Sequence, residues 1–234
     1  MGSIKITILQ KDINNEISRE LKQKIISQKS DFLILPEFFP FTSKNSNIVN
    51  LASNATKNLD NLIELSNSYK GVIIGGSFIR EENGKYFHSC PIVFEGVLVD
   101  WYDQKHLSKN CNPEVSKGEK DSFYILKGIR FAILMGQDLN DPKLLQNIKN
   151  EEIKFLFYIA SEVDNDFSFE EDLARFSRIA RENNVYLFRS CGIGNLFEKE
   201  LKGRSLYSSP SGINWKVAPS EEAAEIIKTI NLNY

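Results

Sequence analysis

The chain has 234 residues, and 41% of them are hydrophobic, which is enough to fill a sizeable core. The 29 basic and 31 acidic residues are interspersed and nearly cancel, so neither nucleic acid nor a membrane surface is an expected partner. No apolar run approaches the length of a membrane span.

The cysteines and histidines restrict the chemistry further. The three cysteines, Cys90, Cys111 and Cys191, include no CxxC pair, which favours a reducing cytoplasm over a disulfide framework. The N-terminus is too short and too alternating for a signal peptide. His88 and His106 are far apart in sequence and lack a neighbouring cluster of cysteines or carboxylates, so neither a metal site nor a cofactor is expected.

The first half of the chain mixes strands with two helices. The alternation of isoleucines with polar residues after Ser3 predicts a strand, and Asn14 or Asn15 is expected to cap the helix that follows. Asn83-Gly84 is a strong hairpin signal. Strands are expected at 3–9, 31–35, 72–80, 86–94 and 97–102, a second helix at 56–68, and a polar loop at 103–121.

The second half is organised by a strand-to-helix turn at Gly136, which we call the elbow. A hairpin of strands at 123–126 and 128–135 leads into it, and Asp138 or Asn140 is expected to cap a helix over 142–149. After it come predicted strands at 155–160, 185–190, 204–209 and 213–217, a helix at 170–183 and a final segment at 224–232. With no linker or repeat, we predict one domain, 1–234, of the α/β or α+β class with helices outside the sheets.

Two charged residues follow apolar strands before the elbow. Glu37 precedes Phe38 and Phe39, and a partly desolvated carboxylate there suits a general base, although an ordinary surface carboxylate is the simpler interpretation. Lys105 follows the strand at 97–102, where a buried ammonium would stabilise an oxyanion, unless it is a solvated lysine whose stem covers aromatic rings.

Taken together, five stretches resemble the motifs of the nitrilase superfamily, the carbon–nitrogen hydrolases, in the family's order and over essentially the whole chain. They are Leu35-Pro36-Glu37, Tyr102-Asp103-Gln104-Lys105-His106-Leu107, Leu134-Met135-Gly136-Gln137-Asp138 before Pro142, residues 174–186, and Gly203-Arg204-Ser205 followed by Ser209-Pro210-Ser211-Gly212. Glu114 resembles a second glutamate that the family keeps near its lysine.

This resemblance implies a fold, a reaction and a set of residues. The family fold is a four-layer αββα sandwich, and its members commonly form dimers. In the family a cysteine attacks an amide or nitrile carbon, a glutamate acts as base, and a lysine and the N–H after the cysteine stabilise the oxyanion. The resemblance assigns these roles to Glu37, to Lys105 and to the N–H of Gln137, and it implies a small amide, nitrile or carboxylate as ligand.

The nucleophile position, however, is occupied by Gly136. Without a thiol no thioester forms, so we predict a pseudoenzyme that binds but does not hydrolyse. Cys191 and Cys111 are the candidates for a displaced nucleophile, but a small packed residue is the favoured interpretation of each.

Two alternatives to the pseudoenzyme stay open. One is an active thiol amidase whose cysteine was replaced at Gly136 to inactivate it. The other is an unrelated α/β ligand-binding domain, which the absence of a contact between Glu37 and Lys105 would favour.

Overall fold

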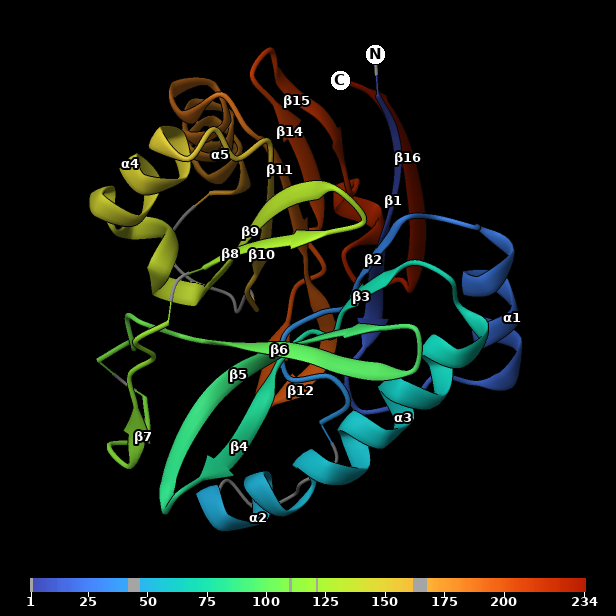
Figure 1. The fold of residues 1–234 in the computed structure, drawn as a ribbon, viewed down its shortest axis with the longest axis vertical. Helices are drawn as coiled ribbons and strands as arrows, with labels where there is room; N and C mark the ends of the chain where they lie inside the picture. Colours follow the sequence, from blue (N-terminus) through green and yellow to red (C-terminus); the bar gives the residue numbers. More distant parts are fainter. Residues whose placement is uncertain (1, 42–46, 110, 121, 162–167) are drawn as a thin grey trace.

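The computed structural model describes residues 2–41, 47–109, 111–120, 122–161 and 168–234, and two sheets organise them (Figure 1). In the first sheet the strand order is β13-β12-β1-β2-β3-β5-β4, with β16 beside β1 and with β6 and β7 beside β5. Its strands are β1 (Ser3–Asp12), β2 (Phe32–Ile34), β3 (Val72–Ile74), β4 (Phe78–Glu82), β5 (Lys85–Phe94), β6 (Val97–Asp103), β7 (Val115–Ser116), β12 (Gly192–Leu196), β13 (Lys199–Leu201) and β16 (Ile226–Asn233).

The second sheet has the order β15-β14-β11-β10-β9-β8. Its strands are β8 (Phe123–Leu126), β9 (Ile129–Met135), β10 (Phe155–Ile159), β11 (Tyr186–Ser190), β14 (Leu206–Ser209) and β15 (Gly212–Lys216). Strands β9, β10 and β11 are parallel, as are β1, β2 and β3 in the other sheet. Both sheets therefore have a parallel centre whose carboxyl ends can carry a site.

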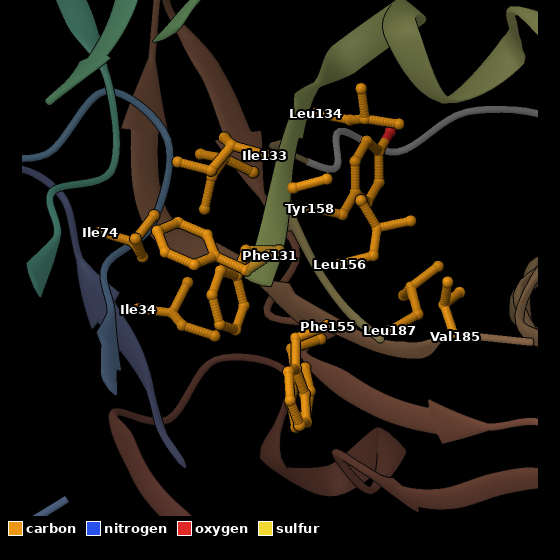
Figure 2. Close-up of a cluster of buried hydrophobic side chains, with 14 of the residues drawn as sticks. Ile34, Ile74, Phe131, Ile133, Leu134, Phe155, Leu156, Tyr158, Val185 and Leu187 are labelled. Carbon is orange, nitrogen blue, oxygen red and sulfur yellow. The ribbon is translucent and has the colours of Figure 1, made fainter. Parts of the chain in front are cut away.

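The main core lies between the two sheets. Phe32 of β2 packs on Phe131 of β9 and Phe157 of β10, with ring centroids 5.2 and 5.1 Å apart. Figure 2 shows Phe131 beside Ile34 and Ile74, which come from the opposite sheet. Strands β2, β3 and β10 are apolar along their whole length because both of their faces are buried.

Helices cover the outer face of each sheet. On the first sheet lie α1 (Arg19–Ser27) and α3 (Ala55–Ser68), whose Ile25, Leu62 and Leu65 form a second core with the outward side chains of β2 and β3. On the second lie α4 (Pro142–Asn150) and α5 (Phe169–Asn183), at the upper left of Figure 1 and away from α1 and α3. The arrangement is the four-layer αββα sandwich that the sequence resemblance implied. No helix in the described ranges is both long enough and apolar enough to cross a membrane.

Two helix caps differ from the predictions. Ser18, and not Asn14 or Asn15, caps α1, and its Oγ accepts the N–H of Leu21. Asn14 instead donates to the carbonyl of Asn195 and so ties β1 to β12. Asp141 caps α4 in place of Asp138 or Asn140.

Three features in and around the first sheet also differ from the predictions. The predicted strand over 72–80 is two strands, β3 and β4, separated at Gly76, which has a φ of 69°. The helix α2 (Ile48–Ser53) and the hairpin β12–β13 were not predicted. The hairpin turn uses Phe197 and Glu198 at positive φ, so it lacks the glycine that normally signals such a turn.

Candidate functional site

A cavity of about 400 Å³ lies where the ends of strands from both sheets meet. Its walls are largely apolar, with a few polar groups. The lining residues are Glu37, Phe38, Ile48, Leu51, Ile79, His88, Gln104, Ser108, Cys111, Asn112, Val115, Gly136, Gln137, Ser161 and Phe197. A small apolar pocket with convergent polar groups is the usual form of a ligand site.

Glu37 enters this cavity from the end of β2 and is only 8% exposed. Its Oε2 accepts the backbone N–H of Ser161, which follows β10 in the opposite sheet. Its Oε1 lies 3.8 Å from Nε2 of His88, beyond hydrogen-bonding distance. Within the described part of the chain, one oxygen of this buried carboxylate is therefore left available to a ligand.

The wall beside Glu37 is held by Phe38, a bulky residue in the left-handed region at a φ of 53°. Its N–H donates to Oγ of Ser77, and its ring stacks on His88 with centroids 4.5 Å apart. Phe197 meets the same ring edge-on at 5.6 Å. These contacts fix an aromatic wall next to the carboxylate.

Gly136 forms the elbow between β9 and the short 3-10 helix η1 (Gly136–Asn140), at a φ of 46°. Its carbonyl accepts the hydroxyl of Tyr158 at 3.0 Å. A Cβ placed on Gly136 would lie 2.7 Å from Nε2 of Gln104. The space that a nucleophilic side chain would need at the elbow is therefore taken by an amide.

Gln104 is held there by hydrogen bonds at every polar position of its side chain. Nε2 donates to the carbonyls of His106 at 2.9 Å and Met135 at 3.3 Å, and Oε1 lies 2.8 Å from Nδ1 of His88. Because Oε1 only accepts, His88 carries a proton on Nδ1, and when the ring is neutral its Nε2 accepts the hydroxyl of Ser77 at 2.7 Å. From Ser77 through His88 to Gln104 at the elbow, these side chains are therefore hydrogen-bonded to groups of the protein itself.

Asp138 fastens the elbow to the loop after β6. Its carboxylate accepts the hydroxyl of Tyr102 at 2.7 Å and the backbone N–H groups of Lys105, His106 and Met135. Burial raises the pKa of the Asp138 carboxyl, and the bonds from Tyr102 and His106 oppose that shift. The residue is fully buried, so its role is to hold the two segments together.

The structure brings together only some of the residues predicted from sequence. Glu37, Gly136 and Gln137 line the cavity, whereas Lys105 and Glu114 do not. The side chain of Lys105 is half-buried, and Glu114 is exposed beside Asn112, whose side chain accepts its N–H. The contact predicted between Glu37 and Lys105 is not formed, and Gln104 is the residue of this loop that faces the elbow.

Strand alternation explains why Gln104, and not Lys105, reaches the elbow. Successive side chains of a strand point to opposite faces. Tyr102 points toward Asp138, and Asp103 points the other way, where Arg80 pairs with it at 2.8 Å. Gln104 therefore shares the face of Tyr102. Extending this alternation past the end of the strand would have identified Gln104 from sequence.

His88, Ser161 and Phe197 were also missed. His88 gave no signal within an apparent strand, and the other two follow elements whose spatial neighbours cannot be read from local pattern. Ser161 reaches Glu37 across 124 positions of sequence. Within the described ranges, no group of three or more histidine, cysteine or acidic side chains is arranged to hold a metal ion.

The cysteines lie in different surroundings. Cys111 lines the cavity, and burial, together with the charge of Glu37, raises the pKa of its thiol, although the N–H of Asn112 opposes the shift. Cys191 is fully buried outside the cavity, with its Sγ 3.6 Å from the carbonyl of Ala160. Cys90 is in the core between the sheets, where burial raises the pKa of its thiol. Neither Cys90 nor Cys111 therefore has the lowered pKa that favours a thiolate nucleophile.

Comparison with solved structures identifies the fold. A carbon–nitrogen hydrolase superfamily protein from Xanthomonas campestris, with an arsenic adduct in its active site, matches at a TM-score of 0.83 and 17% identity, covering 100% of this chain and 91% of that one. A variant of an amidase from Nesterenkonia sp. AN1, with the acetamide moiety of fluoroacetamide added at its active-site cysteine, matches at 0.77 and 12%, covering 98% and 90%.

A third structure places the same fold within a longer protein. The glutamine-dependent NAD+ synthetase of Acinetobacter baumannii matches at a TM-score of 0.78 and 15% identity over 99% of this chain, which spans 46% of the synthetase. No protein-family model and no curated protein sequence matches the chain. The chain therefore has the carbon–nitrogen hydrolase fold, and the resemblance drawn from its sequence motifs is confirmed at the level of the fold. An unrelated α/β fold is excluded, although the contact between Glu37 and Lys105 is absent.

Proposed function

We propose that this chain is a non-hydrolysing protein with the carbon–nitrogen hydrolase fold, which binds a small amide-like molecule in the cavity beside Glu37. The observation that carries the proposal is the position of Gln104. Its amide nitrogen lies 2.7 Å from where a Cβ on Gly136 would be, so the place of a nucleophile has no thiol and is filled by a hydrogen-bonded amide.

The chemistry supports the loss of turnover. Hydrolysis by this fold's thiol route needs a nucleophile within about 3–3.5 Å of the reacting carbon, and loss of the nucleophile removes most of the rate enhancement. Glu37 has no thiol at the elbow to deprotonate. Cys111 lines the cavity, but burial raises the pKa of its thiol. The residues of the cavity therefore retain a binding site without a nucleophile at the elbow.

The main alternative is an active amidase whose cysteine was replaced at Gly136. A replacement of that one residue would leave the rest of the site as it was built for the thiol. Gln104 instead fills the space at the elbow, and its hydrogen bonds to His88, His106 and Met135 account for its whole amide. A native cysteine would displace that amide, so the surroundings favour glycine as the natural residue.

The test is to rebuild the nucleophile in two steps and to map acyl adducts at residue 136 by mass spectrometry, using activated esters and small amides. We expect no turnover by the wild type and no adduct in Gly136→Cys, because Gln104 crowds the thiol. In the double variant Gly136→Cys/Gln104→Lys the obstruction is replaced by a cation facing the elbow, and an adduct at 136 is expected. Adding Lys105→Ala to the double variant should leave the formation of this adduct unchanged.

Two outcomes would contradict the proposal. Turnover of any small amide by the wild type would show that a nucleophile other than residue 136 operates. Full turnover by Gly136→Cys alone would show that the site still accommodates its thiol, which is the expectation of the replaced-cysteine alternative. Reaction of the introduced thiol with a small alkylating agent, measured in each variant, provides the control for access.

The proposal extends to assembly and location as the sequence indicated them. Two copies are expected to pair, as the resemblance implies, and light scattering on the purified protein measures this directly. A cytoplasmic location is supported by the three cysteines, which form no disulfide among the described residues.

A further inference from the structure

The charge of the cavity is set by one residue. Among its lining residues Glu37 is the acid, and none is a lysine or an arginine. His88 has both ring nitrogens engaged, with Gln104 and Ser77. Because burial raises the pKa of Cys111, its thiol adds no negative charge. The described lining therefore holds one carboxylate and, apart from the engaged His88, no basic group of the kind that an anionic ligand would need.

Apart from His88, whose Nε2 is engaged by Ser77, Glu37 has no basic partner among the described residues. Its Oε2 is used by the N–H of Ser161, and its Oε1 faces the cavity, with Nε2 of His88 at 3.8 Å already occupied. A carboxylate that is 8% exposed is costly to keep unless it is paired or hydrogen-bonded. A ligand that brings a positive N–H donor would complete its bonding and gain a charge-assisted hydrogen bond.

The rest of the cavity suits the remainder of such a ligand. Phe38 and Phe197 form one aromatic wall, and aromatic faces attract cations as well as apolar groups. Four aliphatic side chains also line the cavity: Ile48, Leu51, Ile79 and Val115. At about 400 Å³ the cavity is near the lower end of the usual range for ligand pockets.

We infer that the natural ligand carries a primary ammonium group on a small apolar body, with the ammonium on Oε1 of Glu37 and the apolar part against Phe38 and Phe197. The inference rests on the proposed function, since it specifies the ligand of that same site. It replaces the carboxylate class implied by the sequence, because that class depended on Lys105 reaching the cavity. Amides remain ligands of lower affinity, with an N–H donor but no charge.

Three compounds of the same size and different charge test this in the unmodified protein. Benzylamine is a cation at neutral pH, benzamide is neutral and benzoate is an anion, and calorimetry at physiological salt gives their dissociation constants. We expect benzylamine to bind at least about tenfold more tightly than benzamide, as a charge-assisted hydrogen bond allows, and benzoate to bind least. Binding of benzylamine should weaken as salt is raised.

Two variants locate the effect. Glu37→Gln keeps the shape of the side chain and removes the charge, so benzylamine should lose about tenfold or more while benzamide stays within about threefold. Glu119→Gln is the matched control, since Glu119 is exposed and does not line the cavity, and it should bind all three compounds as the wild type does. Thermal unfolding of each variant establishes that it is folded.

The inference is overturned if benzamide or benzoate binds the wild type as tightly as benzylamine. Failure of benzylamine to bind at millimolar concentration, or a preference for it that survives in Glu37→Gln, has the same consequence. These outcomes are separate from failure of the proposed function, which would appear as hydrolysis of benzamide. If benzamide binds without being hydrolysed and benzylamine does not bind, the proposed function stands and the ammonium ligand is excluded.

Discussion

The cavity contains two groups of polar residues in opposite states. Next to the elbow, Gln104 and His88 satisfy each other and the surrounding backbone, so they offer little to a ligand. Beside His88, Glu37 uses one oxygen for Ser161, and its second oxygen has no hydrogen bond within the described residues. Some polar residues that line the pocket have all their hydrogen bonds made within the protein, and others keep an unused acceptor or donor. Only the second kind can select a ligand.

The largest effect is expected where the elbow is fastened to the loop after β6. Asp138→Asn puts an amide NH2 where the carboxylate accepts the N–H of Met135 and the hydroxyl of Tyr102. Buried donors then face each other, and we expect a loss of about 2–4 kcal/mol in the free energy of unfolding. Denaturant titration followed by fluorescence measures it.

Asp141→Asn is the control for that substitution. Asp141 caps α4 and pairs with the half-exposed His106, and asparagine caps a helix nearly as well. Its loss should stay below about 1 kcal/mol, as for an exposed pair. Equal losses in the two variants would show that Asp138 is not a special anchor of the elbow.

The next effect tests whether Gln104 blocks the elbow. Gly136→Ala has a backbone penalty of about 1–2 kcal/mol for a Cβ in the left-handed region, and it also pushes the Gln104 amide from its partners. In the double variant Gly136→Ala/Gln104→Ala there is no amide to displace, so only the backbone penalty of Gly136→Ala should remain. We therefore expect the double variant to be about 1 kcal/mol more stable than the sum of the two single losses predicts.

Gly84→Ala separates the backbone penalty from the crowding. Gly84 has a φ of 75° in the β4–β5 hairpin, and a Cβ there meets nothing within 4 Å. Gly84→Ala should lower the free energy of unfolding by the backbone penalty alone, and this loss should add to that of Gln104→Ala without coupling. Additive losses for Gly136→Ala and Gln104→Ala would mean that the amide does not obstruct the elbow.

The smallest effect is the position of one proton on each of the two histidines. His88 is expected to carry its proton on Nδ1, because that nitrogen faces Oε1 of Gln104. His106 is expected to carry its proton on Nε2, which lies 2.7 Å from Oδ2 of Asp141. Nitrogen-15 NMR at alkaline pH, where both rings are neutral, distinguishes the two tautomers. A proton on Nε2 of His88 at that pH would contradict the bonding described around Gln104.

How far the sequence could predict the site depended on how regular the local structure is. Glu37 and Gly136 follow apolar strands, and their place just after those strands was evident from pattern alone. Lys105 lies in a polar loop just past β6, where a shift of one residue changes which side chain faces the elbow. Lys105 was predicted to face the elbow because of the chemistry of its side chain. The alternation of side chains along β6 instead places Gln104 there.

By itself the sequence determined the alternation of strands and helices, the elbow with its missing thiol, and a resemblance that implied the αββα sandwich. Apolar periodicity and glycine turns are local signals, and they persist whatever the chain folds against. Only the tertiary structure decided that Gln104 fills the elbow, that Ser161 uses one oxygen of Glu37, and that Phe197 closes the aromatic wall. Those contacts join segments far apart in sequence, and the packing of two sheets, rather than any local preference, brings them together.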